Sequence, residues 1–319
     1  MNKRKTAASV SCWAALACLV VPMFASYFFD DMFSSLSQLF RNPELLELGW
    51  DSADYGFYAG GYSFLCVWGG LIVCGMLLDK WTAGAALVTF AITSGMAPKT
   101  SLTVAYAGCM LFGLGSEIAG VGVTRSIAKW FKGRNMAFAM GLQLAIARLG
   151  TALALILSPM LVKAKAEGEI YTLLETAKPA FFGLALLLLG TVLWAVFVMM
   201  DARFDAQNGL TDRKERKEED EFKFSDIFKV LSNKHFIMSA LLCVFFYCSI
   251  ISFKKFATSI LIPRFDLPAE SASLMVSLIP FSTVIFAPLF GSLVDRVGKG
   301  TRWMIAGSVL VFIAHIIIA

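Results

Sequence analysis

Long apolar runs dominate the chain, and short polar segments separate them. Each run is about 20 residues long, which is the length that an α-helix needs to cross the hydrocarbon core of a bilayer. The runs lie at residues 8–29, 55–78, 83–99, 102–128, 136–161, 178–200, 236–261, 270–293 and 302–319. The pattern therefore predicts an all-α membrane protein whose polypeptide crosses the bilayer at each of these runs.

Composition and charge placement support this prediction. Hydrophobic residues make up 58% of the 319 positions and charged residues only 16%, whereas about a quarter of a soluble domain is charged. Basic residues gather at the N-terminus and in the connections after the second, fourth and eighth runs, which all fall on one side of the membrane. Because cytoplasmic loops are enriched in Lys and Arg, we expect a cytoplasmic N-terminus. This distribution explains the net charge of +5 without nucleic acid as a partner.

The longest polar segment, about residues 201–234, divides the chain after the sixth run. Its centre, Thr211 to Glu221, is almost entirely charged with both signs, which is typical of a solvated linker. The next piece, Phe222 to Leu231, has apolar residues at helical spacing and could lie on the membrane surface. We expect a six-helix bundle, a cytoplasmic linker with an amphipathic helix, and part of a second bundle, at residues 1–200, 201–234 and 235–319.

The sequence gives little support for a bound cofactor or for enzyme chemistry. The seven cysteines fall within or beside apolar runs, where they act as small packing residues, and two histidines cannot form a metal site alone. The glycines near Gly113 lie inside a span rather than after a strand, so they do not form a nucleotide loop. We expect no metal, no cofactor, no catalytic residues and no enzymatic activity.

A loop motif occurs twice, at matched points of the two halves. After the eighth run the chain reads Gly-Ser-Leu-Val-Asp-Arg-Val-Gly-Lys-Gly from position 291, and after the second run it reads Gly-Met-Leu-Leu-Asp-Lys-Trp-Thr from position 75. Both resemble the G-x-x-x-D-R-x-G-R/K loop of the major facilitator superfamily, a fold built from parallel repeats. Thr82 replaces the second glycine in the first copy. The alternative is an ordinary basic turn.

That resemblance implies two bundles that rock about a central site, with the repeated loop as a gating motif. The gating residues would be Gly75, Asp79, Lys80, Gly291, Asp295, Arg296, Gly298 and Lys299. A narrower resemblance covers residues 113–150 and points to the branch that includes the lysosomal dipeptide uniporter. Because the last apolar run stops at Ala319 without a polar anchor, we expect a fragment that lacks about three spans.

Two opposite charges mark the candidate site. Glu117 and Arg148 each lie in the middle of a span, where a charged side chain costs about 2.5–3.5 kcal/mol on insertion scales and therefore usually serves a function. Glu117 can bind an ammonium group, and the forked guanidinium of Arg148 can bind a carboxylate. The branch resemblance implies that the pair holds the two termini of a dipeptide. Alternatively, the two residues form a structural ion pair with each other.

Further candidates surround this pair. Lys254, with Tyr247 on the same helical face, could meet a substrate carboxylate from the second bundle, or it could extend to the outer interface. Tyr58 and Tyr62 lie on one face of the second span and border either the pathway or the interface. Asp30 and Asp31 end the first span, where they either guard the pathway or are simply solvated.

We therefore expect a multi-pass transporter of the bacterial inner (plasma) membrane. It would be secondary active or facilitative and would move a small zwitterionic solute, with dipeptides as the leading candidates, by alternating access. Two alternatives stay open, namely a carrier of another small solute such as an organic anion, and a membrane scaffold that transports nothing. The expected partners are a small-molecule substrate and membrane lipid, and an accessory subunit is left open.

Overall fold

The computed structural model describes residues 2–47, 49–66, 102–132, 136–165, 168–208, 224–297 and 300–318. The regular structure in these ranges is helical, which confirms the predicted all-α class. Within them, extended backbone pairs at one isolated bridge, between Leu46 and Tyr171. The predicted span at 83–99 lies outside the described residues.

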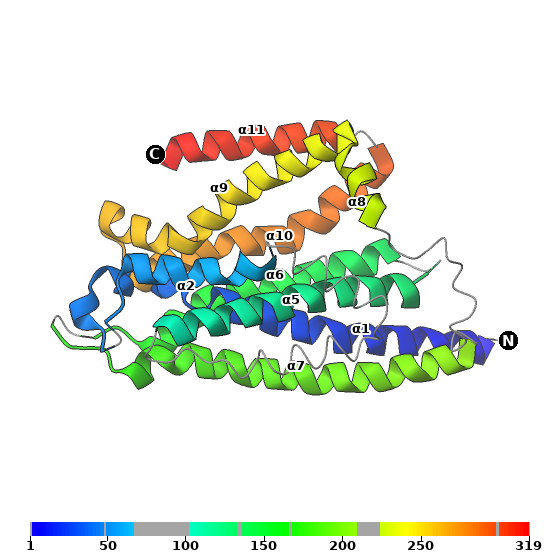
Figure 1. Cartoon of the computed structure of the whole chain (residues 1–319), viewed down its shortest axis with the longest axis horizontal. Coiled ribbons are helices and arrows are strands. Elements are labelled where there is room, and N and C mark those ends of the chain that lie inside the picture. Colours follow the sequence, from blue (N-terminus) through cyan, green and yellow to red (C-terminus); the bar gives the residue numbers. More distant parts are fainter. Residues whose placement is uncertain are drawn as a thin grey trace.

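Nine α-helices are found in the described part of the chain (Figure 1). They are α1 (Asn2–Asp31), α2 (Ser52–Leu65), α5 (Leu102–Trp130), α6 (Met136–Val162), α7 (Leu173–Asn208), α8 (Phe224–Leu231), α9 (Lys234–Phe265), α10 (Ala269–Val297) and α11 (Gly300–Ile318). Three short 3₁₀ turns follow α1, namely η1 (Ser34–Leu36), η2 (Leu39–Arg41) and η3 (Pro43–Leu45). Six of the described helices are long and apolar enough to cross a membrane. The protein is thus an integral multi-pass membrane protein.

The long helices lie roughly along one direction, so the bundle has two distinct ends (Figure 1). One end holds the N-terminus and α8, and we call it the N-terminal end. The connections from α1 to α2, from α6 to α7 and from α9 to α10 gather at the opposite end, which we call the loop end.

Glycines bring the helices of the first bundle into backbone contact. A side chain at Gly150 of α6 would overlap the backbone of Phe24 in α1, and one at Gly113 of α5 would overlap the backbone of Tyr62 in α2. Small residues at such crossings allow close helix approach. As a result α1 lies directly against α6, and α2 lies directly against α5, which sets the positions of the charged residues on α5 and α6.

The sixth span is longer than the sequence predicts. α7 continues to Asn208, past the expected boundary at residue 200. Lys129 at the end of α5 explains the extension, because its ammonium lies 2.9 Å from Asp201 and 2.6 Å from Asp205. Trp130 also donates a hydrogen bond to Asp201 at 2.7 Å. These contacts anchor the last turns of α7 to α5.

The second part of the chain contacts the first mainly through α10, which packs closely against α6. The buried residues of α9 are Lys254, Ala257, Thr258 and Ser259, while its residues 234–250 are all exposed or half-buried. Ala257 shares a small core cluster with Val276 of α10 and Leu155 of α6. Before α9, α8 exposes large apolar side chains such as Phe228 and Leu231, as expected for an amphipathic helix. The proposed domain boundaries stay a prediction.

Candidate functional site

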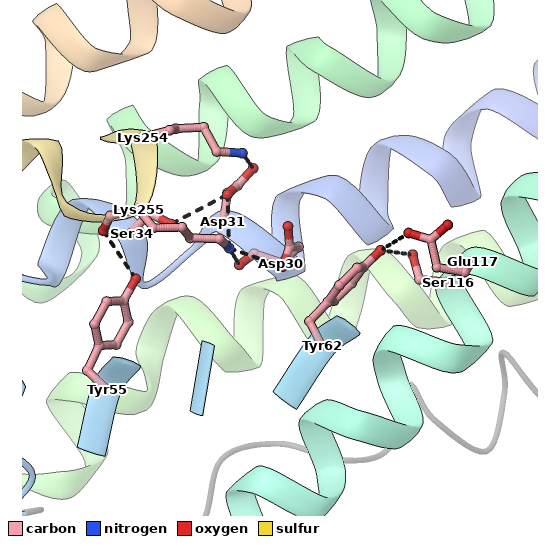
Figure 2. A network of polar contacts seen from close by, with 9 residues as sticks. All are labelled: Asp30, Asp31, Ser34, Tyr55, Tyr62, Ser116, Glu117, Lys254 and Lys255. Atoms are coloured by element: carbon pink, nitrogen blue, oxygen red, sulfur yellow. Dashed lines mark hydrogen bonds and ion pairs between the residues drawn. The ribbon is translucent and has the colours of Figure 1, made fainter. Parts of the chain in front are cut away.

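Glu117 lies on α5 and faces α2. The Tyr62 hydroxyl donates a hydrogen bond to Oε1 of Glu117 at 3.1 Å and also contacts the Ser116 hydroxyl at 3.2 Å (Figure 2). Glu117 remains half-buried rather than enclosed. The close crossing at Gly113, one turn earlier on α5, brings Tyr62 within reach of the carboxylate.

Arg148 lies on α6 and faces α1. Its guanidinium carbon is 5.2 Å from the centre of the Tyr27 ring, which is a cation–π distance. Gly150, two residues further along, allows α6 to approach α1 closely enough for this contact. The guanidinium is therefore oriented by an aromatic face, and its hydrogen-bond donors are not taken up by any carboxylate in the described part of the chain.

Glu117 and Arg148 are not bound to each other. No ion pair joins them in the described structure, although Tyr27 of α1 interacts electrostatically with both. The arrangement differs from the structural ion pair considered as the alternative. Arg148 instead lies over the Tyr27 ring and Glu117 is bound by Tyr62, and both charged residues are half-buried.

A second charged group lies at the loop end and joins the two parts of the chain (Figure 2). Lys254 of α9 binds Asp31 of α1 at 2.7 Å, and the Asp31 side chain is 0% exposed. Lys255 lies 3.1 Å from a carboxylate oxygen of both Asp30 and Asp31. Lys255 also donates to the main-chain oxygen of Asp30 at 2.7 Å. Two acids and two bases thus neutralise one another across the interface.

Hydroxyl groups extend this interface beside the charges. The Ser37 and Thr258 hydroxyls are 2.9 Å apart, and Thr258 donates to the main-chain oxygen of Ser34 at 3.2 Å. Arg41 donates to the main-chain oxygen of Ser259 at 2.7 Å. The contact between the two halves is therefore largely polar at this end.

The structure separates the predicted site residues into several groups. Tyr62 lies with Glu117, while Lys254 is buried against Asp31 instead of extending to the interface. Tyr247 is 47% exposed. Tyr58 lines a small cavity together with Phe29, Asp30, Phe33, Tyr55, Ala59, Cys109, Phe112 and Lys255.

Most of the predicted gating motif cannot be placed. Gly75, Asp79, Lys80, Gly298 and Lys299 lie outside the described residues. The remaining three, Gly291, Asp295 and Arg296, belong to the last turns of α10 at the N-terminal end. The role of this motif stays a prediction.

Sequence reasoning missed Tyr27 and the pairing of the two acids with the two lysines. Tyr27 gives no signal, because an aromatic residue in an apolar run is typical of a membrane span. A signal did exist for the pairing. Asp30 and Asp31 end one span at the loop end, and Lys254 and Lys255 lie near the loop end of another, so the opposite charges occur at similar depth.

The helical membrane fold is that of a membrane transporter, and the chain belongs to the Major Facilitator Superfamily. The sequence profile of that family matches residues 16–319, which confirms the resemblance inferred from the repeated loop. Among curated proteins, the chain is similar to the "lysosomal dipeptide transporter MFSD1" of several vertebrates.

The identities to these relatives are low and their coverage is partial. The Mus musculus protein is 24% identical over 308 residues, covering 93% of this chain and 64% of the relative. The Danio rerio protein is 25% identical over 307 residues with the same coverage. The Gallus gallus protein is 28% identical over 224 residues, covering 66% of this chain and 47% of the relative. The chain therefore spans less than two thirds of the length of these relatives.

Proposed function

We propose that the intact protein transports a small zwitterionic solute, with dipeptides as the leading candidates, by alternating access between two bundles. One observation carries the proposal. Glu117 and Arg148 are opposite charges inside spans, and neither neutralises the other. Because a charge in a span is costly without a partner, the pair is suited to a solute that supplies one positive and one negative group.

The two positions suit the two ends of a dipeptide. Glu117 would bind the terminal ammonium while Tyr62 fixes the carboxylate by its hydrogen bond. Arg148 would bind the terminal carboxylate through two parallel hydrogen bonds while Tyr27 supports the guanidinium plane. Recognition of the termini alone leaves the substrate side chains unread, so we expect broad selectivity. The relatives are named as dipeptide transporters, which supports the same solute class.

The other candidate residues have lesser roles in this proposal. Lys254 is bound to Asp31 in this structure, so it would meet a substrate carboxylate only after that ion pair opens. Tyr58 would border the path next to Asp30 and Lys255. Tyr247, half-exposed on α9, would face the path from the second bundle.

The cellular membrane and the orientation stay predictions. We expected a bacterial inner membrane from the sequence, whereas the relatives are named for the lysosome and come from vertebrates. A cytoplasmic N-terminus rests on the positive-inside distribution alone.

Chemically capped dipeptides test the site. In liposomes containing the full chain, N-acetylation or C-amidation of a dipeptide should each lower the apparent affinity at least about tenfold, since each removes one charged contact worth about 1.4 kcal/mol or more. Glu117→Gln should lose its sensitivity to N-acetylation only. Arg148→Gln should lose its sensitivity to C-amidation only. Glu44→Gln, an exposed acid at the loop end, is the matched control and should behave as wild type.

Other outcomes would point to the alternatives. If N-acetylation leaves wild-type uptake unchanged and simple monocarboxylates compete, the protein is an organic-anion carrier and Glu117 is not an ammonium site. If no small solute is taken up or stabilises the protein, the scaffold alternative is favoured. If both neutral variants respond to both caps as wild type does, the site assignment is refuted.

A further inference from the structure

A short amphipathic helix, α8, begins the second part of the chain, and the proposed transport function does not use it. In α8 the apolar positions 224, 227, 228 and 231 share one helical face, and the polar positions 225, 226 and 229 fall on the opposite face. Phe228 is 72% exposed and Leu231 is 53% exposed. The described part of the chain therefore leaves the apolar face of α8 largely uncovered.

The direction of α8 differs from that of the long helices. Figure 1 shows α8 running across them at the N-terminal end, so it lies roughly in the plane of a membrane that they cross. Only Ser232 and Asn233 separate α8 from α9. The main-chain nitrogen of Ser232 donates to the carbonyl oxygen of Phe228 at 2.9 Å, and the Asn233 side chain accepts from the main-chain nitrogen of His235 at 3.0 Å. This hydrogen-bonded turn holds α8 crosswise to α9.

The start of α9 places α8 at the boundary of the membrane. The candidate span on α9 extends from Lys234 to Phe265, so the turn before it lies at the level where the chain enters the lipid. Large apolar side chains are exposed from the first turns of α9 onward, with Phe236 at 46% and Met238 at 61%. The exposed apolar residues of α8 are thus followed directly by those of a spanning helix. A bilayer covers both surfaces, because an amphipathic helix at this level buries its apolar face at the headgroup boundary.

Basic residues predominate at the junction of α8 and α9. Between positions 224 and 235 the chain has Lys229 and Lys234 but a single acid, Asp226. Both lysines lie at exposed positions. A lysine close to a membrane surface is attracted to anionic headgroups and favours the bound form about fivefold. The junction therefore fits a surface that combines an apolar interior with negatively charged headgroups.

We propose that α8 lies in the headgroup region of the membrane that α9 crosses. Phe228 and Leu231 insert between the lipids, and Lys229 and Lys234 contact anionic headgroups. The occupant of the exposed apolar face is thus lipid. This contact anchors the first turn of α9 at the membrane surface, and it does not depend on which solute the protein transports.

Spin labels on the two faces of α8 test this arrangement. The full chain, with its seven native cysteines replaced by alanine, is reconstituted in liposomes with one new cysteine that carries the label. Oxygen concentrates in lipid and a nickel chelate stays in water, so relaxation by these two agents reports the depth of the label. Labels at Phe228→Cys and Leu231→Cys should respond more to oxygen, and a label at Lys229→Cys should respond more to the nickel chelate. Glu44→Cys, at an exposed position of the loop end, is the water-exposed control.

Lipid composition tests the charged contact. The ratio of lipid-inserted to water-exposed label at Phe228→Cys is compared in liposomes of phosphatidylcholine alone and in liposomes with about one third phosphatidylglycerol. The anionic lipid should raise this ratio at least about fivefold. Lys229→Gln combined with Lys234→Gln should abolish the rise.

Several results would overturn the proposal. If the labels at positions 228 and 231 respond mainly to the nickel chelate, the apolar face lies in water. If they are shielded from both agents, protein rather than lipid covers this face. Equal responses at positions 228 and 229 would show that α8 does not lie flat at the surface. A ratio that phosphatidylglycerol does not change, or a rise that persists without the two lysines, would contradict the headgroup contact. These measurements need no solute, so their failure would leave the transport proposal untouched.

Discussion

Removal of Lys254 should destabilise the fold, because Asp31 has no exposed surface and depends on the two lysines of α9. The carboxylate of Asp31 lies 2.7 Å from Lys254 and 3.1 Å from Lys255. A double-mutant cycle built from Lys254→Met, Asp31→Asn and their combination measures how strongly the first pair is coupled. Both substitutions remove a charge while keeping much of the side-chain volume.

The magnitudes follow from what each variant leaves behind. Lys254→Met leaves Asp31 with Lys255 as its remaining ion-pair partner and the Ser34 hydroxyl at 3.4 Å, so we expect a loss of about 2–3 kcal/mol, the worth of a charge-assisted hydrogen bond. Asp31→Asn leaves Lys254 buried without another acid at ion-pair distance in the described structure, which costs about 3–5 kcal/mol. The double variant strands neither charge and preserves the pair of Lys255 with Asp30, so it should cost about 2 kcal/mol. The coupling should therefore reach at least about 3 kcal/mol.

Unfolding of the full chain by sodium dodecyl sulfate in mixed micelles, followed by tryptophan fluorescence, provides the free energies. The pair of Lys165 with Glu175 is the control, because both side chains are partly exposed and such surface pairs contribute little. A Lys254–Asp31 coupling below about 0.6 kcal/mol, which is usual for hydrogen bonds between membrane helices, would refute the reasoning. So would a double variant less stable than both single variants.

Three further predictions concern the site. The new methyl group of Gly150→Ala would overlap the backbone of α1, so this variant should lose about 1–3 kcal/mol of stability in the same unfolding assay. Gly141→Ala, which has open space around it on the same helix, should not destabilise the protein. Equal effects of the two variants would contradict the close crossing. Tyr27→Leu should weaken dipeptide binding, measured by calorimetry, by about 0.5–2 kcal/mol, because the ring face carries the cation–π contact. Tyr27→Phe keeps the ring and should retain most of the affinity. Identical losses in the two variants would argue against that contact. Tyr62→Phe removes a hydrogen bond to Glu117 worth about 1 kcal/mol, so it should weaken binding of a free dipeptide about fivefold. It should not change binding of the N-acetyl derivative of that dipeptide. An equal loss for both ligands would show that Tyr62 does not act through the ammonium site at Glu117.

The spans and the two site charges could be predicted because each depends on local pattern. A run of about 20 apolar residues forms a spanning helix wherever it occurs, since the lipid satisfies no backbone hydrogen bond. A charge inside such a run is visible without knowledge of its surroundings, as with Glu117 and Arg148. The extra turns of α7 were not predicted, because Asp201 and Asp205 look like linker residues until Lys129 is found beside them.

The sequence places the opposite charges of Asp30, Asp31, Lys254 and Lys255 at similar depth, but which side chains pair depends on how the helices cross. The sequence alone is equally compatible with Lys254 as a substrate ligand, an interfacial lysine or an ion-pair partner. Only the position of α9 against α1 shows which carboxylate it meets. Tyr27 likewise becomes notable only once the glycine at 150 brings α6 against α1.

The zwitterionic solute that we propose also fits the charge balance of the described residues better than an anion does. Asp30, Asp31, Lys254 and Lys255 carry two negative and two positive charges, and they neutralise one another through direct contacts. Glu117 and Arg148 then remain as one negative and one positive charge, so the empty site is already neutral overall. A zwitterion matches both groups and leaves the total at zero. A monocarboxylate would leave Glu117 unmatched and would add a net negative charge to the site. In a medium of low dielectric an uncompensated charge costs several kcal/mol, because it is a buried ion without a partner.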